Sequence, residues 1–495
     1  MKRVVDADGM RSYEQARFSD GRAESLAWME RAAEGVDALL LSRYSGRSVL
    51  AVCGGGNNGG DGFALLRLLH LRGIDCAGVL LADSQKLSGD ARINFLRAQE
   101  CGIRFFKELT GESIAKYDVL VDAIFGTGLS RPIAGIYADA IAQINASGKP
   151  VVAVDIPSGV DATSGAILGC AICARETVTF AFFKRGHLLF PGRGCCGETI
   201  VHPLSRELEE AGDVCLFTRE DAARLLPKRP PDSHKGKNGR ALLCVGSVRY
   251  TGAALLSTAA ALRAGAGLTS AAVPGALKAA FCALPEAMAE PVCDGGDWDE
   301  AACERAKQLL PQKSAVCVGC GMGRGNILPL VEAVLHARIP AVLDADALNR
   351  MAEALETLTR LHEDVILTPH PAEMARLCGE PIAAILSDPI GVSQAYAKRW
   401  GCVVLLKGAT SCISNGVQVR LNTTGNAGLA KGGSGDVLAG LITGLLAQGM
   451  PAFDAASCGA FLLGASADMA LELLKERMLL ARDVIDALKQ TIEQM

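Results

Sequence analysis

The residues best suited to chemistry lie in a glycine-dense segment, residues 424–440, which reads TGNAGLAKGGSGDVLAG. An apolar helix pattern starts near Gly435. The first N–H groups of a helix have no partner inside it, and glycine lets the backbone approach a ligand closely, so the segment predicts a site for a phosphate oxygen. Asp436 is its only carboxylate, and a helix start favours the anion, which can take a proton from a hydroxyl group.

A helix cap is the simpler interpretation of Asp436, because aspartate is common at helix starts. Several glycines packed around one serine and one aspartate carry a high cost in chain entropy, however, and a plain turn does not need them. We therefore favour the functional interpretation.

A second glycine-rich segment, residues 54–62, reads GGGNNGGDG and stands between an apolar strand pattern and a helix pattern that starts at Phe63. Strand, glycine loop and helix in this order are typical of the start of a Rossmann-like unit. The spacing differs from the G-x-G-x-x-G of dinucleotide dehydrogenases, and Asn57, Asn58 and Asp61 add polar atoms that a simple pyrophosphate loop does not need. We expect this loop to hold something more specific than a diphosphate.

Two further apolar strand patterns in the first half each deliver a carboxylate at their end, Asp122 in one and Asp155 in the other. The carboxyl ends of parallel strands form the ligand-binding edge of an open sheet. We therefore expect both acids to converge with Asp61 on one crevice, beside the loop of residues 126–132. For each acid taken alone, a loop cap is the alternative.

The elements that must position these residues alternate between strand and helix patterns in both halves of the chain. This alternation predicts an α/β fold with parallel sheets covered on both faces. The 495 residues exceed a single hydrophobic core. A proline-rich, basic stretch at residues 228–237 is typical of a domain entry, so we place a first domain at residues 1–215 and a second at residues 216–495.

The second half contains an alanine-rich helix pattern between Tyr250 and Ala264. Its small side chains would let the helix lie close to the sheet or to a flat ligand. The strand patterns that follow end in polar turns near Gly319, Asp344 and Thr368 and, before the last glycine segment, at Lys407.

The composition excludes several classes of partner. The net charge is −4 and no dense cluster of lysine and arginine occurs, so neither nucleic acid nor an anionic membrane is expected. The start of the chain has no apolar core of signal-peptide length, and no later charge-free stretch has the length of a membrane span. We expect a soluble, cytoplasmic protein that acts on small molecules.

The eighteen cysteines stand mostly in apolar surroundings, which is typical of reduced, buried thiols rather than of a disulfide framework. Two C-x-x-C pairs, Cys170/Cys173 and Cys317/Cys320, could together form a four-thiolate zinc site. Both pairs lie in strand-like runs and not on tight turns, so we favour structural thiols.

The motifs GGGNNGGDG, DAIFGTGL and VDIPSGV of the first half closely resemble those of the NAD(P)H-hydrate epimerase family, over nearly all of residues 1–215. The resemblance implies a Rossmann-like, three-layer α/β/α domain. It also implies a set of residues that bind the hydrated nicotinamide substrate: Asn57, Asn58, Gly59, Gly60, Asp61, Gly126, Thr127, Gly128, Leu129, Ser130, Arg131, Pro132 and Asp155.

The same resemblance implies a potassium ion held by Asn58, Asp122 and Ser158, and oxygen ligands suit such a hard cation. Epimerisation of the hydrated ring carbon needs the hydroxyl to leave and return, or the ring to open and close. Either route requires proton transfer by a positioned group. Asp155 is our first choice for this group and Asp61 the second, while His187 is expected to be a surface or packing residue.

The order of motifs in the second half, closing on GGSGD, resembles the ribokinase-like fold and, in detail, the ADP-dependent NAD(P)H-hydrate dehydratase family, over roughly residues 220–495. The resemblance implies that ADP is bound by Lys407, Gly408, Ala409, Thr410, Ser411 and Gly435. It implies that the hydrated dinucleotide is bound by Ala253, Gly321, Gly323, His370 and Asp436. For His370 the alternative is a structural role as a hydrogen-bond partner of the backbone. For Lys407 the alternative is a surface charge at the end of a strand. The family usually has proline where Cys320 stands.

This resemblance implies chemistry that the glycine segment can support. Water is a poor leaving group, and transfer of a phosphoryl group onto the hydroxyl of the hydrate converts it into phosphate, which leaves readily. Asp436 would accept the hydroxyl proton while the amides of residues 433–435 stabilise the phosphoryl group. Mg²⁺ should accompany ADP, and the candidate acids for it are Asp344, Asp346 and Glu373.

The leading hypothesis is therefore a two-domain metabolite-repair enzyme. The first half interconverts the R and S hydrates of NADH and NADPH, and the second dehydrates the S form at the expense of ADP, giving AMP and phosphate. We expect a homo-oligomer with NAD(P)H hydrates and ADP as its small-molecule partners. One alternative is a ribokinase-like kinase of a small alcohol with an accessory Rossmann-like domain, and another is a non-enzymatic binding module in the first half.

Overall fold

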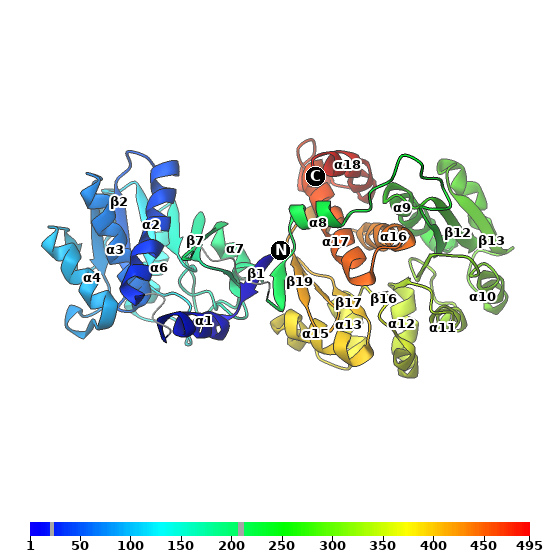
Figure 1. The fold of residues 1–495 in the computed structure, drawn as a ribbon, viewed down its shortest axis with the longest axis horizontal. Coiled ribbons are helices and arrows are strands. Elements are labelled where there is room, and N and C mark those ends of the chain that lie inside the picture. Colours follow the sequence, from blue (N-terminus) through cyan, green and yellow to red (C-terminus); the bar gives the residue numbers. More distant parts are fainter. Residues whose placement is uncertain (20–23, 206–211) are drawn as a thin grey trace. The chain divides into compact units, whose positions relative to one another are not determined.

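The computed structural model describes residues 1–19, 24–205 and 212–495. The chain divides into two compact units, Lys2–Gly212 and Asp213–Met495, each with its own sheet and helices (Figure 1). The expected domain boundary after residue 215 falls inside strand β10, Val214–Leu216.

The first unit is built on a parallel sheet with the strand order β4-β3-β2-β5-β6-β7-β9. Its strands are β2 (Val49–Cys53), β3 (Cys76–Leu80), β4 (Phe105–Phe106), β5 (Val119–Ala123), β6 (Val151–Val154), β7 (Glu176–Phe180) and β9 (Glu198–His202). A separate parallel pair joins β1 (Lys2–Val5) to β8 (Phe183–Lys184). The predicted strands of the first half are confirmed.

Helices cover both faces of this sheet. They are α1 (Ala7–Ser19), α2 (Ser25–Arg43), α3 (Asn57–Leu71), α4 (Gly89–Glu100), α5 (Gly111–Ala115), α6 (Ile136–Ala146) and α7 (Arg193–Cys196), with short helices η1 (Ser84–Lys86) and η2 (Arg185–His187). Alternate residues of β2 enter different cores: Val49 and Ala51 pack in the cluster that contains Phe63, while Leu50 and Val52 pack in the cluster that contains Ile141. This alternation produces the predicted three-layer α/β/α arrangement.

The expected helix start at Phe63 is wrong, because α3 already begins at Asn57. Gly54, Gly55 and Gly56 form a short loop, while the later glycines of the segment lie in the first turns of the helix and allow them to approach the sheet closely. A Cβ atom at Gly59 would lie 2.1 Å from the Gly54 carbonyl oxygen, and one at Gly62 would lie 2.7 Å from the Cβ of Ala123. Any larger side chain would push the helix away from β2 and β5.

The second unit has a sheet with the strand order β13-β12-β11-β14-β15-β16-β17-β18-β19-β10. Its strands are β10 (Val214–Leu216), β11 (Arg240–Cys244), β12 (Leu268–Pro274), β13 (Met288–Cys293), β14 (Ala315–Val318), β15 (Ala341–Leu343), β16 (Val365–Leu367), β17 (Val403–Leu406), β18 (Ser411–Ser414) and β19 (Val419–Asn422). The pairs from β13 to β17 are parallel as expected, but β18 runs antiparallel to both of its neighbours. The expectation of a wholly parallel sheet is therefore wrong.

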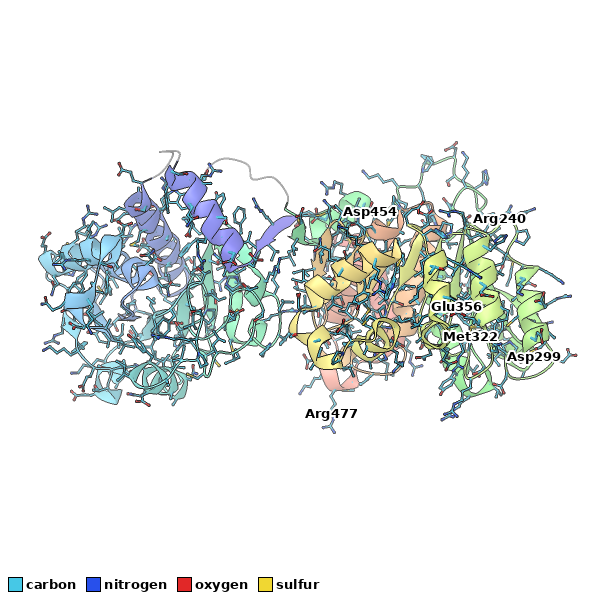
Figure 2. The ribbon with its side chains drawn as sticks, turned by 90° about the horizontal axis from the view of Figure 1, so that it is seen from below. Arg240, Asp299, Met322, Glu356, Asp454 and Arg477 are labelled. Carbon is cyan, nitrogen blue, oxygen red and sulfur yellow. The ribbon has the colours of Figure 1, made fainter. Side chains whose placement is uncertain are left out.

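The helices of the second unit are α8 (Arg219–Leu225), α9 (Thr251–Arg263), α10 (Glu300–Lys307), α11 (Leu328–His336), α12 (Asp346–Glu353), α13 (Pro371–Cys378), α14 (Ile382–Ser387), α15 (Pro389–Trp400), α16 (Ser434–Ala447), α17 (Ala452–Ala470) and α18 (Ala481–Glu493). Short helices are η3 (Val248–Tyr250), η4 (Gly275–Ala283), η5 (Leu355–Arg360), η6 (Ala427–Leu429) and η7 (Glu476–Met478). Figure 2 shows their side chains, with Arg240 at the start of β11 and the α10 cap Asp299 labelled. In the described ranges no helix combines the length and the apolar character that a membrane span requires.

The small side chains of α9 serve to pack it against α16. A Cβ atom at Gly440 would lie 2.1 Å from the Ser257 carbonyl oxygen, and one at Gly444 would lie 2.6 Å from that of Ala261. This contact anchors α16, whose first turn carries Asp436.

Candidate functional site

The first unit contains a cavity of about 600 Å³ at the carboxyl ends of β2, β5 and β6. Ten of the predicted residues line it: Asn57, Asn58, Asp61, Gly126, Thr127, Gly128, Leu129, Ser130, Arg131 and Asp155. Gly59 and Gly60 are buried in α3, and neither they nor Pro132 belong to the lining of this cavity. Helix α1, which the sequence patterns did not predict, adds Arg11 and Glu14 to the wall.

Asp155 is held by a lysine that the sequence reasoning missed. The Nζ atom of Lys184 lies 2.6 Å from Oδ1 of Asp155, and the hydroxyl of Thr179 donates to the same oxygen at 3.1 Å. The side chain of Lys184 has no exposed surface. A lysine inside the otherwise apolar sequence AFFK was the only available signal.

His187 also contacts Asp155, so of the two expected positions, surface or packing, it has the packing one. Its side chain is buried, Nδ1 accepts a hydrogen bond from the backbone N–H of Lys184 at 3.0 Å, and Nε2 lies 2.9 Å from the carbonyl oxygen of Asp155. Because Nδ1 is an acceptor, the proton resides on Nε2, which donates to that carbonyl. Burial lowers the pKa of His187 to about 4, which keeps the ring neutral.

The carboxyl groups in this cavity differ in whether the protonated or the ionised form is favoured. Burial, together with the charge of Asp155, raises the pKa of Asp61 well above its usual range. Burial would also raise the pKa of Asp155, but the ammonium of Lys184 and the hydrogen bonds to this carboxylate lower it. Burial and then Asp155 raise the pKa of Glu14. Two neighbouring carboxyl groups with opposite shifts can act as a base and an acid.

Asp122 is not among the residues that line the cavity, so of the three acids expected to converge there only Asp61 and Asp155 line it. Asp122 is buried and accepts hydrogen bonds from the hydroxyl of Ser158 at 2.6 Å and from its N–H at 2.8 Å. Burial raises the pKa of Asp122 to about 6, against these hydrogen bonds.

The oxygens around Asp122 fit a hard cation. No lysine, arginine or histidine among the described residues forms an ion pair with this carboxylate, and a buried carboxylate without a counter-charge is costly. The hydroxyl of Ser158 adds an oxygen atom beside Asp122, and Asn58 carries an amide oxygen on the cavity wall. Oxygen-only ligands of this kind suit an alkali or alkaline-earth ion.

The second unit contains a cavity of about 760 Å³ under the glycine segment that precedes α16. Six predicted residues line it: His370, Lys407, Gly408, Ser411, Gly435 and Asp436. Ala409 and Thr410 continue the Gly408 turn without reaching this lining. Ala253 and Gly321 lie elsewhere, against each other, since a Cβ atom at Gly321 would be 2.7 Å from that of Ala253. Gly323 lines a separate cavity with Asp346.

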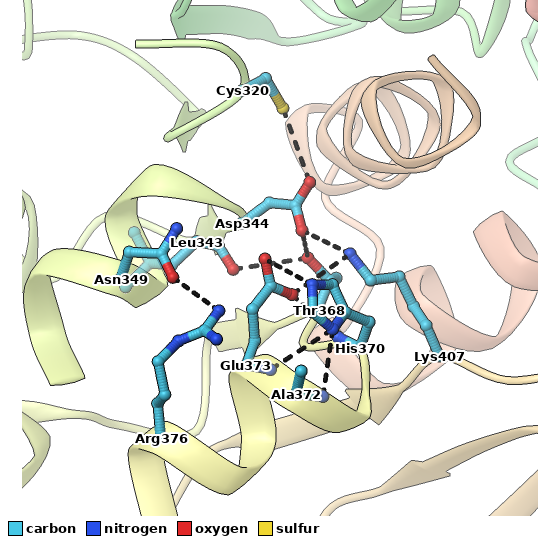
Figure 3. A network of polar contacts seen from close by, with 10 residues as sticks. All are labelled: Cys320, Leu343, Asp344, Asn349, Thr368, His370, Ala372, Glu373, Arg376 and Lys407. Atoms are coloured by element: carbon cyan, nitrogen blue, oxygen red, sulfur yellow. Dashed lines mark hydrogen bonds and ion pairs between the residues drawn. The ribbon is translucent and has the colours of Figure 1, made fainter. Parts of the chain in front are cut away.

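A network of polar contacts surrounds Asp344 on one side of this cavity (Figure 3). Lys407 Nζ and the hydroxyl of Thr368 each donate to Oδ1 of Asp344 at 2.8 Å, and Nζ lies 3.8 Å from Oε2 of Glu373. Burial would lower the pKa of Lys407, but Asp344 and Glu373 raise it. The alternative of a surface charge at a strand end is therefore wrong.

His370 has the structural role that was its alternative interpretation. It is the N-cap of α13, where Nδ1 accepts hydrogen bonds from the backbone N–H groups of Ala372 at 3.1 Å and Glu373 at 3.3 Å. The carboxylate of Glu373 accepts from the N–H of His370 at 2.8 Å in return. The side chain of His370 also lines the cavity, so it can contact a ligand there.

Asp436 is not a helix cap, because α16 begins at Ser434 with Gly433 as its N-cap. Our expectation that the helix start favours its anion is wrong in direction. Burial and the neighbouring charge of Asp344 raise the pKa of Asp436 to about 6, which outweighs the helix dipole. The carboxylate still predominates at neutral pH and can accept a proton.

Three acids were candidates for Mg²⁺ and the structure separates them. Asp344 and Glu373 line the cavity of the second unit. Asp346 lines the separate cavity and accepts a hydrogen bond from the N–H of Gly323 at 2.7 Å. Cys320 is buried, with Sγ 3.8 Å from Oδ2 of Asp344 and 4.0 Å from Sγ of Cys317.

Each of the two units matches the model of a known protein family. The family described as NAD(P)H-hydrate dehydratase matches residues 241–490, and the family described as YjeF-related protein N-terminus matches residues 25–186. A bifunctional NAD(P)H-hydrate repair enzyme of Moorella thermoacetica is 36% identical over 99% of this chain and 97% of its own length. This chain belongs to the bifunctional NAD(P)H-hydrate repair enzyme family.

Further relatives agree with this assignment. The bifunctional NAD(P)H-hydrate repair enzyme of Escherichia coli is 33% identical over 94% of this chain and 89% of its own. The crystal structure of an ADP/ATP-dependent NAD(P)H-hydrate dehydratase from Bacillus subtilis, co-crystallised with ATP and Mg²⁺, has a TM-score of 0.51 and 31% identity, over 57% of this chain and 99% of that one. A ribokinase-like superfamily protein of Enterococcus faecalis, 24% identical with a TM-score of 0.51, shares the fold. The predicted family and fold class are confirmed.

Proposed function

We propose that this chain repairs hydrated NADH and NADPH in two steps, one in each unit. The first unit interconverts the R and S hydrates. The second dehydrates the S hydrate with consumption of ADP, which yields AMP, phosphate and the restored coenzyme. The observation that carries this proposal is the presence of both sites in one chain: a cleft with Asp61 and Asp155, and a glycine-segment cavity with Asp436 and Lys407.

In the first unit, Asp155 is the proposed base and Asp61 the proposed acid. Whether the hydroxyl leaves and returns or the ring opens and closes, one group must remove a proton and another must supply one. A carboxylate kept charged by Lys184 can remove the proton, and a buried, protonated carboxyl group can supply it. The loop of residues 126–132 and Asn57 would hold the rest of the hydrated nicotinamide.

Potassium would be held by Asn58, Asp122 and Ser158 in this unit. The bound cation would neutralise the buried Asp122 carboxylate. Ser158 and the loop after β5 are linked to Asp122 by hydrogen bonds, including one from the N–H of Phe125 to the Ser158 hydroxyl at 2.9 Å. The cation would thereby stabilise the loop that binds the substrate.

In the second unit, the hydroxyl of the S hydrate attacks the terminal phosphoryl group of ADP. Asp436 takes the hydroxyl proton, and the backbone N–H groups of residues 433–435 stabilise the charge on the phosphoryl oxygens. The phosphate then leaves as the ring loses a proton and the dihydropyridine is restored. Lys407 would contact the nucleotide phosphates, with Gly408 to Ser411 around the adenosine.

Mg²⁺ would supply the remaining neutralisation of the nucleotide phosphates. Asp344 and Glu373 would hold it, because both carboxylates line the cavity beside Lys407. The Bacillus subtilis dehydratase, crystallised with ATP and Mg²⁺, supports this use of a nucleotide with its metal. Ala253, Gly321, Gly323 and His370 would contact the hydrated dinucleotide.

The test uses the purified full chain with a mixture of R and S hydrates and follows the near-ultraviolet absorbance of dihydronicotinamide. With ADP, both epimers should be recovered completely. Asp155→Asn should stop recovery once the S form is consumed, whereas Asp436→Asn should abolish all recovery. A small-alcohol kinase, the alternative function, would instead accumulate a stable phosphorylated product without any gain of absorbance.

A cytoplasmic location and a homo-oligomeric state remain proposals. Fractionation of cells and light scattering of the purified chain would test them. Recovery of the chain in the membrane fraction, or a mass equal to one chain at all concentrations, would overturn the respective proposal.

A further inference from the structure

Lys184 is a charged side chain with no exposed surface, at the end of β8. All of its hydrogen-bonding capacity is used. Nζ lies 2.6 Å from Oδ1 of Asp155, 2.9 Å from the hydroxyl of Thr179 and 3.1 Å from the carbonyl oxygen of Phe180. Because each N–H of the ammonium donates to a different acceptor, the three contacts together fix the position of Nζ.

A buried ammonium is costly unless it is paired, and an apolar residue at this position would suit the core better. Among the residues that the structure describes, Asp155 is the one carboxylate within ion-pair distance of Lys184. The stability of β8 therefore does not explain the lysine. The ion pair instead acts on Asp155, which lines the cavity of the first unit.

The segment from Lys184 to His187 holds Asp155 at two points. Lys184 contacts the carboxylate, and Nε2 of His187 contacts the carbonyl oxygen at 2.9 Å. The backbone of Asp155 has a φ of 66°, a left-handed conformation that non-glycine residues rarely adopt. Strain of this kind is found where the surrounding structure fixes a functional group.

The charged and titratable groups that face Asp155 come from four elements. Asp61 belongs to α3, Glu14 and Arg11 belong to α1, Lys184 ends β8, and the neutral His187 lies in η2. Of the four carboxyl groups that line this cavity, Glu14, Asp61 and Asp155 interact through their charges, and like charges oppose each other's ionisation. The contact with Lys184 decides which of the three is the anion.

We propose that Lys184 is a positioning residue of the epimerase reaction, which holds Asp155 in place as the anionic member of the Asp61–Asp155 pair. This inference rests on the proposed function of the first unit. In the ring-opening route, Asp155 removes the hydroxyl proton and Asp61 supplies one to the ring nitrogen, as the ring C–N bond breaks and a C=O bond forms. The reverse step returns both protons, so the pair ends the cycle as it began.

The test is Lys184→Met in the full chain, with the interconversion of pure R and S hydrates measured as a function of pH. The turnover number should fall about 100-fold near neutral pH, with a small change in KM. The acidic limb of the rate profile should move to higher pH by about one unit or more, because Asp155 without the ammonium keeps its proton longer. Dehydration of the S hydrate in the same sample reports that the second unit is intact.

Three further variants separate this role from a structural one. Lys149→Met is the matched control, since Lys149 donates to the carbonyl oxygens of Ala115 and Tyr117 away from the cavity, and it should behave like the wild type. Lys184→Arg keeps a positive charge and should restore the acidic limb. In an Asp155→Asn background, the change Lys184→Met should cost little more, because the two residues act together.

The outcomes distinguish this inference from the proposed function. A wild-type chain that does not interconvert the hydrates would overturn the proposed function itself. An active wild type with a Lys184→Met variant that keeps its rate, or that loses rate equally at every pH, would overturn the role of Lys184 alone. Additive losses in the double variant would overturn it as well.

Discussion

The Nζ atom of Lys407 lies 2.8 Å from Oδ1 of Asp344, in the cavity under the glycine segment of the second unit. The pair also borders Gly435, where a Cβ atom would lie 3.8 Å from Nζ and 3.7 Å from Oδ2 of Asp344. A nucleotide phosphate bound over the start of α16 would therefore meet the ammonium of Lys407, with Asp344 beside it.

Lys407→Met should impair both dehydration and folding of the second unit. Asp344 is only 3% exposed in its side chain, and removal of one partner from a buried ion pair costs about 3 kcal/mol. KM for ADP should rise at least about tenfold through loss of the phosphate contact. Chemical denaturation and steady-state kinetics measure the two effects.

The control for this change is Lys489→Met, which removes an exposed ion pair with Glu493. It should leave both quantities unchanged. The double change Lys407→Met with Asp344→Asn should recover part of the stability, because position 344 then no longer carries an unpaired buried carboxylate, although Glu373 still lacks the ammonium. Wild-type stability in the single variant would contradict the importance of the pair.

Gly435→Ala should weaken ADP binding without loss of stability. The added Cβ would meet its nearest neighbours at 3.7 Å, an ordinary contact distance, so the fold tolerates it. It would occupy the space in which a phosphate approaches the backbone, and KM for ADP should rise about tenfold or more. Gly295→Ala, at an open position, serves as control, and unchanged ADP kinetics would show that the nucleotide binds elsewhere.

The rate of dehydration should fall as the pH falls through about 6, where Asp436 gains a proton. A base must be deprotonated to act, so activity is present above this pH and lost below it. Burial and Asp344 raise the pKa of Asp436, and the nearby thiol of Cys320 lowers it. Cys320→Ala should therefore move the acidic limb of the rate profile to higher pH.

The matched control is Cys402→Ala, which removes another buried thiol, next to the start of β17. Its profile should coincide with that of the wild type. If the limb of the Cys320→Ala variant also stayed in place, the thiol would have no influence on Asp436.

Potassium should stabilise the first unit against heat, and Asp122→Asn should remove the effect. A cation that binds only the folded state adds about 2.7 kcal/mol at a concentration one hundred times its dissociation constant. Calorimetry in KCl against LiCl at equal concentration measures the difference. Asp118→Asn, which changes an exposed acid just before β5, should keep it, and an equal response in both salts for the wild type would argue against the site.

Local patterns were sufficient for much of the fold. The apolar strand runs, each followed by a polar turn, predicted β2, β5 and β6 and the series from β14 to β17, because burial on both faces of a parallel sheet leaves a continuous apolar signature. The start of α3 was misplaced because glycine has low helix propensity. Its close approach to Gly54 and Ala123 is a tertiary contact that overrides this preference.

The site residues, like the elements of the fold, were predictable only where the signal comes from neighbours in the sequence. The glycine motifs and the acids at strand ends were visible in the sequence, since each depends on neighbouring residues. The role of Lys184 was missed, and His187 was foreseen as a surface or packing residue but not as a partner of Asp155. Both are recognisable only once β8 and η2 fold back beside Asp155.

The sequence by itself determined the family, the alternation of strands and helices, and the positions of Asp61, Asp155 and Asp436 at the edges of two sheets. Only the tertiary structure decided which of these acids carries a charge. Charge depends on burial and on partners that are distant along the chain, as Lys184 is 29 residues from Asp155 and Lys407 is 63 residues from Asp344. Electrostatic energies follow distance in space and not spacing in sequence.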